Sequence, residues 1–419
     1  MRKMRDSGIE WVGAIPQDWQ LSKIGSLYTQ RNEKVSDKDY QPLSVTMQGI
    51  LPQLATAAKT DDGDNRKLVR VGDFAINSRS DRRGSCGISP LDGSVSLINI
   101  ILTPRTAMHP GYYNWLFHTT LFADEFYKWG HGIVADLWTT RWQEMKSITV
   151  PVPEYAEQER IAAFLDAECA EIDAVLEKTR ASIEEYKKLK QAVITQAVTK
   201  GIRGDRPMKD SGIEWIGEIP AEWTASKIKY CTEFAPSCNT SHLSEDSLVT
   251  FTPMECIKNG YFENREAHFS ALSSSYTQYQ DGDIVFAKVT PCFENGNIAI
   301  MQGLSAGVGF GSSELFVIRP QSINTEFIFY YLQNDIFKQY ACATMTGTGG
   351  LKRVSPTFVR NYSVFIPCNE EQLEIVRYLN EKCSGIEVLI AKKQQYLTEI
   401  ENYKKSLIYE YVTGKKEVI

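Results

Sequence analysis

The chain has 419 residues, of which 42% are hydrophobic and 23% are charged, as in an ordinary soluble globular protein. Its net charge of −6 argues against a simple basic nucleic-acid binder, although residues 1–150 carry slightly more basic than acidic side chains. The nine cysteines show neither CxxC nor zinc-site spacing, and no apolar run is long enough for a leader peptide or a membrane span. We therefore expect a cytoplasmic protein of two or three domains with reduced thiols and no membrane association.

A sixteen-residue motif opens the chain and returns near its middle. Residues 4–19 read MRDSGIEWVGAIPQDW, and residues 208–223 read MKDSGIEWIGEIPAEW, with eleven identical pairs. The two copies lie 204 positions apart, which is too long a period for a solenoid repeat. The repeat therefore predicts a two-fold duplication of a domain-sized unit.

Mixed secondary structure is expected between the first motif and residue 153. Residues 69–77 predict a turn followed by a strand, and the β-branched apolar run 95–102 predicts one buried strand. Aromatic residues at helical spacing predict one helix over 112–129, which Gly130 and Gly132 would end. A short strand closed by prolines is expected at 148–153.

A long helix is predicted over residues 154–200, because this stretch contains neither proline nor glycine and Gly201 follows it. Its apolar residues recur in heptads, which is typical of a coiled coil. The predicted seams are Leu165, Ile172, Thr179, Tyr186 and Val193, and Cys169, Leu176, Ile183, Lys190 and Ala197.

The second half repeats this order of elements after a linker at 201–207. Residues 280–286 match the earlier strand entry, 327–341 match the aromatic helix, and 364–367 match the short strand before the long helix. A second long helix is predicted over 370–413, in register with the first at a constant offset of 214. Leu165 then corresponds to Leu379, and Cys169 to Cys383. The predicted seams of the second helix are Leu379, Ile386, Lys393, Ile400 and Leu407, and Val376, Cys383, Ile390, Leu397, Lys404 and Tyr411.

The predicted fold class is α+β or mixed, with two α/β units joined by two long antiparallel coiled-coil helices in a pseudo-two-fold arrangement. An exposed amphipathic helix of this length must bury its apolar stripe, and the sister helix is the nearest candidate. The predicted segments are a first globular domain at 1–153, a first long helix at 154–200, a linker at 201–207, a second globular domain at 208–367 and a second long helix at 368–419.

The twin motifs make the chain resemble the specificity (S) subunits of type I restriction-modification enzymes. The stretch 150–161, which reads VPVPEYAEQERI, its weaker copy at 366–372 and the ending 407–415 are also similar to that family. The resemblance covers the whole chain. It implies that the two globular domains are target recognition domains, that each reads one part of a bipartite, asymmetric sequence in double-stranded DNA, and that the two long helices form a spacer between them.

The resemblance also implies partners and cofactors. Methyltransferase (M) subunits, two of them, and restriction (R) subunits are expected to assemble around the helices. The S subunit itself is expected to be non-catalytic and to bind no cofactor, whereas the partner subunits are expected to use S-adenosylmethionine, ATP and Mg²⁺.

Candidate DNA contacts are basic or polar residues in the loops that follow matching elements of the two halves. Arginine offers bidentate hydrogen bonds to guanine or phosphate, and a solvated surface turn is the alternative for each loop. The residues that we expect to contact DNA are Arg79, Arg82, Arg83, Thr139, Arg141, Lys288, Thr346, Lys352 and Arg353.

Two other classes of function remain open from the sequence. The chain could be a coiled-coil scaffold whose globular ends bind proteins. A self-sufficient nuclease or methyltransferase is disfavoured, because neither an Asn-Pro-Pro-Tyr motif nor a GxGxxG after a strand is present. The five histidines have no paired metal-ligand spacing.

Overall fold

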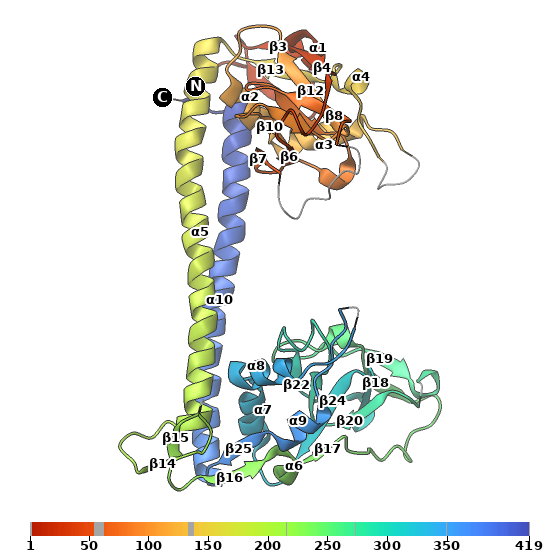
Figure 1. Ribbon diagram of the computed structural model, residues 1–419, viewed down its shortest axis with the longest axis vertical. Helices are drawn as coiled ribbons and strands as arrows, with labels where there is room; N and C mark the ends of the chain where they lie inside the picture. The colour runs from red at the N-terminus through yellow and green to blue at the C-terminus, as the bar shows by residue number, and fades with distance from the viewer. Residues whose placement is uncertain are drawn as a thin grey trace. The chain divides into compact units, whose positions relative to one another are not determined.

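The computed structural model describes residues 2–53, 63–132, 138–214, 216–272, 274–348 and 350–418 (Figure 1). Its contacts divide the chain into two compact units. Unit 1 contains Met1–Arg180 and Gln394–Ile419, and unit 2 contains Ala181–Lys393. The two long helices, α5 (Tyr155–Lys200) and α10 (Asn369–Val412), each contribute one segment to each unit. The sequence instead predicts each long helix as a segment separate from the two globular domains.

Unit 1 is a mixed α/β structure. Its four-stranded sheet has the order β10-β9-β12-β4, with antiparallel neighbours, and three-stranded and two-stranded sheets flank it. Its strands are β1 (Met4–Asp6), β2 (Ala14–Pro16), β3 (Gln20–Lys23), β4 (Tyr28–Arg31), β5 (Lys34–Val35), β6 (Leu43–Thr46), β7 (Gly49–Pro52), β8 (Arg66–Val69), β9 (Phe74–Asn77), β10 (Cys86–Ile88), β11 (Gly93–Val95), β12 (Asn99–Pro104) and β13 (Thr149–Val152). Its short helices are α1 (Ile24–Leu27), α2 (Pro110–Phe117), α3 (Thr120–Lys128) and α4 (Trp142–Met145).

Unit 2 repeats this arrangement. The sheet β17-β24-β21-β22 corresponds to the four-stranded sheet of unit 1, and a second four-stranded sheet has the order β19-β18-β23-β20. Its strands are β14 (Met208–Asp210), β15 (Glu218–Pro220), β16 (Thr224–Lys227), β17 (Thr232–Phe234), β18 (Leu248–Thr252), β19 (Glu266–His268), β20 (Thr277–Gln280), β21 (Ile284–Ala287), β22 (Ile298–Ile300), β23 (Val308–Gly311), β24 (Leu315–Pro320) and β25 (Ser363–Ile366). Its short helices are α6 (Ile228–Cys231), α7 (Thr325–Gln333), α8 (Asp335–Ala343) and α9 (Pro356–Asn361).

Three element predictions need correction. The single strand predicted over 95–102 is two strands, because a turn in which the amide of Asn99 donates to the carbonyl of Ser96 separates β11 from β12. The single helix predicted over 112–129 breaks at Thr119, whose side chain caps α3 by accepting from the amide of Phe122. The matching prediction over 327–341 fails in the same way, because Asn334 ends α7 and caps α8.

The predicted helix seam is buried in both units. In unit 1, Leu165, Cys169 and Leu176 of α5 are at most 4% exposed, and Leu407 of α10 is equally buried. In unit 2, the buried seam residues include Ile183 and Ala197 of α5, and Val376, Leu379, Cys383 and Ile386 of α10. The other apolar seam positions of both helices are half-buried, so the heptads mark the side on which the helices pack.

Two polar pairs across the helices fix their direction. Asp173 accepts from Lys404 at 2.6 Å in unit 1, and Glu387 accepts from Lys190 at 2.5 Å in unit 2. In unit 1, Arg180 also donates to Glu401 at 2.6 Å, so residue numbers rise on α5 as they fall on α10. The helices are therefore antiparallel. Lys190 and Lys404 lie 214 positions apart, as do Asp173 and Glu387. The same ion pair therefore occurs in both units, but the lysine is on α10 in unit 1 and on α5 in unit 2.

In unit 1 the first motif copy, together with Arg2 just before it, contacts the start of α5 and the end of α10. The buried Trp19 donates from its indole to Glu157 in the first turn of α5, at 2.9 Å, and Arg2 forms an ion pair with the same carboxylate. At the end of α10, Lys415 donates to the carbonyl of Val12 at 2.6 Å. We call these contacts the helix-end network.

The second motif copy makes the same network in unit 2. Trp223 donates to Glu371 of α10 at 3.1 Å, and Arg206 pairs with that carboxylate at 2.5 Å. Lys200, at the end of α5, donates to the carbonyl of Ile216 at 2.6 Å. Each motif copy therefore joins the start of one long helix to the end of the other.

Candidate nucleic-acid interface

In unit 1 the chain after β9 pairs with a distant loop. Arg79 forms an antiparallel bridge with Thr139, which forms a second bridge with His131. The carbonyl of Ser78 accepts from the amide of Thr140 at 3.0 Å, and the buried Thr140 side chain donates to the carbonyl of Phe126 at 2.8 Å. Two loops that the sequence predicts separately as DNA contacts are therefore adjacent. We call this element, with its counterpart in unit 2, the bridge site.

The bridge site of unit 2 has the same backbone pairing. Arg353 bridges Val289 on one side and Thr346 on the other. The amide of Thr290 donates to the carbonyl of Lys352 at 3.1 Å, and the amide of Val354 donates to the carbonyl of Lys288 at 2.9 Å. The predicted residues Lys288, Thr346, Lys352 and Arg353 are thus brought together.

The strand partners show which positions correspond between the bridge sites. Arg79 of unit 1 stands where unit 2 has Val289, and Thr139 stands where unit 2 has Arg353. His131 corresponds to Thr346. The backbone of the site is therefore repeated, whereas its side chains differ at all three positions.

The three arginines of unit 1 differ in how far they are already engaged. Arg83 forms an ion pair with Asp124 and lies 6.0 Å from the ring centroid of Tyr127. Arg82, whose side chain is 69% exposed, lies 3.7 Å from its neighbour Asp81. Arg79 is exposed, and no ion pair joins it to a described residue. Arg79 and Arg82 are therefore the more available of the three for an external anion.

A groove of about 830 Å³ in unit 1 is lined by these three arginines. The hairpin β6–β7 forms another part of its wall, with the exposed Met47 between the two strands. Gln53, Arg66 and Asn99 also line it. The sequence alone does not reveal this hairpin or these side chains, because nothing in the local sequence connects residues 43–53 with the arginines.

Arg66 contributes a buried positive charge to this groove. The residue is 4% exposed, and its Nε and Nη2 donate to the hydroxyl and the carbonyl of Ser94, both at 2.9 Å. Burial lowers the pKa of Arg66 from its usual value, yet an arginine stays charged at neutral pH. No carboxylate of the described residues lies within ion-pair distance of it. The groove therefore favours an anionic occupant.

In unit 2 the two predicted residues Arg353 and Lys288 are already engaged within the protein. Arg353 donates through Nε and Nη2 to Glu314, at 2.9 and 2.8 Å. The half-buried Lys288 donates to the carbonyl of Ser313 at 2.7 Å and lies 5.2 Å from the ring centroid of Phe316. Burial lowers the pKa of Lys288, whereas the hydrogen bond from Arg353 lowers the pKa of Glu314. Lys352 is exposed.

Arg141 lies two residues beyond Thr139 and belongs to the start of α4. Its backbone amide donates to Glu144 at 3.0 Å, and its side chain is exposed. Arg141 is therefore close in sequence to the bridge site, but it takes no part in the strand pairing.

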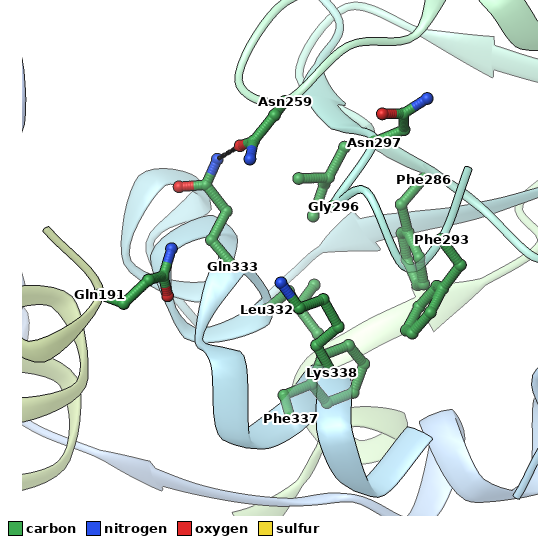
Figure 2. Close-up of a pocket in the computed structure, with 11 residues that line it drawn as sticks. Gln191, Asn259, Phe286, Phe293, Gly296, Asn297, Leu332, Gln333, Phe337 and Lys338 are labelled. Atoms are coloured by element: carbon green, nitrogen blue, oxygen red, sulfur yellow. Dashed lines mark hydrogen bonds between the residues drawn. The ribbon is translucent and has the colours of Figure 1, made fainter. Parts of the chain in front are cut away.

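A small pocket in unit 2 does not enlarge the candidate interface. Figure 2 shows the rings of Phe286, Phe293 and Phe337 on its apolar side, and Gln333 donating to Asn259 at 3.2 Å on its polar side. Its volume of about 30 Å³ has room for roughly two water molecules and not for a nucleotide.

Within the described ranges, no cluster of His, Cys, Asp and Glu could hold a metal ion, and no helix is long and apolar enough to cross a membrane.

Comparison with known proteins relates this architecture to one family. Residues 237–399 match the family model described as the type I restriction modification DNA specificity domain. The chain is 33% identical over 189 residues to the specificity subunit of the type I restriction enzyme EcoEI from Escherichia coli. That alignment covers 43% of this chain and 32% of the relative, so the chain spans about a third of that relative's length.

Two further comparisons extend over nearly the whole chain. The MjaVIII specificity subunit of Methanocaldococcus jannaschii is 23% identical over 427 residues, which cover 96% of this chain and 94% of that subunit. A solved chain from a study of complex assembly and conformational transition in the type I R-M system has a TM-score of 0.73 at 13% identity. The match covers 96% of this chain and 99% of the solved chain, and it shows a shared fold. Residues 237–399 therefore match the type I restriction modification DNA specificity domain, and nearly the whole chain is similar to a specificity subunit of a type I restriction enzyme.

Proposed function

We propose that this chain is the DNA-recognition subunit of a type I restriction-modification complex and that each unit reads one half of a bipartite, asymmetric target. The observation that carries the proposal is the bridge site, which has the same backbone in both units and different side chains at every corresponding position. One fold that presents two different sets of side chains suits two different half-sites, because side chains identify the bases by contacting their edges in the DNA grooves.

The candidate contacts divide by chemistry. The exposed Arg79 and Arg82, with the buried Arg66 in the same groove, would form the contact surface of unit 1, and Lys352 and Arg353 that of unit 2. Arg83 and Lys288 are held by contacts within the protein, so we assign them a smaller share of the binding energy.

The chain itself is proposed to be non-catalytic, with methylation and cleavage carried out by partner M and R subunits that bring S-adenosylmethionine, ATP and Mg²⁺. Two M subunits are supported by matched apolar positions on the helices. Val175 and Leu389, which are 214 positions apart, are 40% and 42% exposed, and the next such pair, Leu189 and Tyr403, is 49% and 54% exposed. Each unit contains one residue of each pair, which would offer the same partner two equivalent docking positions.

The direct test measures binding of duplex DNA by the chain together with its M partner and S-adenosylmethionine. We expect a single bipartite sequence to bind preferentially, with the logarithm of the affinity falling linearly as the logarithm of the salt concentration rises, by roughly 0.9 per phosphate contacted. The absence of any preferred sequence under these conditions would overturn the proposal.

A coiled-coil scaffold that binds proteins through its globular units is the competing function. Such a protein would show no linear salt dependence for DNA and no sequence preference. Methylation mapping of genomic DNA in cells with and without the chain separates the two functions, because only a recognition subunit changes which sites are methylated.

A further inference from the structure

The ion pair between Arg353 and Glu314 supports a more specific inference, which rests on the proposed function. Arg353 uses its Nε and Nη2 to bind both carboxylate oxygens, at 2.9 and 2.8 Å. This contact occupies one edge of the planar guanidinium. The edge formed by Nη1 and Nη2 stays available, since Nη1 makes no hydrogen bond to a described residue.

The available edge is accessible from outside the protein. The side chains of Arg353 and Glu314 are 52% and 31% exposed. A guanidinium edge with two parallel N–H donors matches the O6 and N7 acceptors that guanine presents in the major groove, and no other base presents two acceptors there. The carboxylate behind the guanidinium prevents it from rotating away from this orientation.

The backbone that carries Arg353 is held on both sides. Arg353 is the middle member of the bridge site, between Val289 and Thr346. Thr290 donates from its hydroxyl to the carbonyl of Gly350 at 2.8 Å and accepts from the amide of Lys352 at 3.0 Å. A reading side chain needs this kind of support, because its geometry must be fixed before the target binds.

Gly347 allows the close approach of the loop backbone. Its φ is +149°, and a Cβ at this position would lie 2.2 Å from the carbonyl oxygen of Leu351. Any other residue would therefore displace the segment that leads into Arg353.

The carboxylate does not cancel the attraction for DNA. Lys288 also stabilises the ionised form of Glu314, so this group of three side chains carries one net positive charge. In unit 1, the strand register places Ile98 where unit 2 has Glu314, and Thr139 stands at the position of Arg353. The ion pair is therefore absent from the corresponding position of the other bridge site.

We propose that Arg353 reads a guanine in the half-site bound by unit 2, and that Glu314 is a positioning residue that holds the guanidinium edge toward that base. The half-site bound by unit 1 has no equivalent contact from Thr139.

The experiment maps methylation in cells that supply the M partner with the wild-type chain, R353K, E314Q, K352A or R265K. R353K keeps the positive charge and loses the pair of parallel N–H donors, whereas E314Q removes the negative charge that orients the guanidinium. K352A tests a neighbouring phosphate contact. R265K controls for the substitution itself, because Arg265 is also 52% exposed and lies near Glu255 and Glu263, at 3.6 and 3.7 Å.

The expected result is a guanine at one position of one half-site whose selection falls roughly ten- to hundred-fold in R353K, with a smaller fall at the same position in E314Q. The other half-site should keep its preference in both variants. K352A should weaken methylation evenly across sequences, and R265K should change nothing.

A wild-type half-site without guanine would overturn the proposal, as would unchanged preferences in R353K or an even loss over both half-sites. Co-purification of each variant with the M partner excludes misfolding as the cause of a change. If the wild-type chain directs no bipartite methylation at all, the proposed function itself fails, which is a different outcome.

Discussion

The helix-end network and the bridge site show opposite outcomes of the same duplication. In the helix-end network, Trp19 and Trp223 donate to carboxylates at the same helical position, and those carboxylates pair with arginines 204 positions apart. In the bridge site the backbone pairing is kept and the side chains are changed. Side chains are thus retained where they assemble the scaffold, and they diverge where an external molecule would meet them.

The largest expected effect tests whether the two helix-end networks are equivalent. Trp19→Ala and Trp223→Ala each remove a side chain that is at most 2% exposed and leave its carboxylate partner without the indole donor. Each should lower the free energy of unfolding by about 3–5 kcal/mol. Trp129→Ala is the matched control, because Trp129 is 41% exposed and should cost under about 1 kcal/mol. Denaturant unfolding followed by circular dichroism measures this, and a large difference between the two buried sites would break the equivalence.

The second effect concerns the helix seam. Ile183→Asp places a charge at a position that is 5% exposed, and it should cost about 3 kcal/mol or more. Co-purification with the M partner should be lost as well. Glu184→Ala, on the exposed face one residue away, should cost under about 0.5 kcal/mol. If both substitutions leave the helices and the complex intact, the seam does not have the role assigned to it.

The third effect separates the arginines of unit 1. Arg82→Ala should weaken DNA binding about five- to tenfold at low salt, because the side chain is exposed and only loosely paired. Arg83→Ala should weaken binding less, since Arg83 is already paired with Asp124 and lies over Tyr127. Anisotropy titrations with labelled duplex measure both affinities. Equal losses would show that the contacts within unit 1 do not limit the availability of Arg83.

The smallest effect is the pH dependence that comes from the ion pair in the bridge site of unit 2. Arg353 lowers the pKa of Glu314 below its usual value. A lowered carboxylate pKa in the folded state contributes stability above the unfolded-state pKa, and this contribution is lost as the pH falls through the folded-state pKa. In E314Q the corresponding decline in melting temperature on acidification should be smaller than in the wild-type chain. An identical decline in both proteins would contradict the pairing.

The sequence predicts the parts of this protein that depend on local periodicity. The heptads predict both long helices and their buried seam, including Leu165 and Leu379, because burial of an apolar stripe follows directly from spacing. The sequence does not reveal the breaks at Thr119 and Asn334, since a polar cap inside an apolar run is a weak signal beside the surrounding aromatic residues.

The candidate site is only partly accessible to sequence reasoning. The basic loops can be found from composition, and the structure brings Arg79 next to Thr139, and Lys288 next to Arg353. The partner Glu314 and the hairpin that carries Met47 have no local signal, because strand register brings them to the site from elsewhere in the chain.

The α10 segment of unit 1 also affects the order in which the chain can fold during synthesis. Unit 1 contains residues 394–418, and Tyr112 donates to the carbonyl of Val412 at 2.8 Å. The ribosome must therefore translate all of unit 2 before unit 1 can close its core, a delay of roughly tens of seconds at ordinary elongation rates. During that interval the aromatic core around Tyr112 lacks its α10 segment. Chaperones are consequently needed most during this interval, when the apolar core of the nascent first unit is still incomplete.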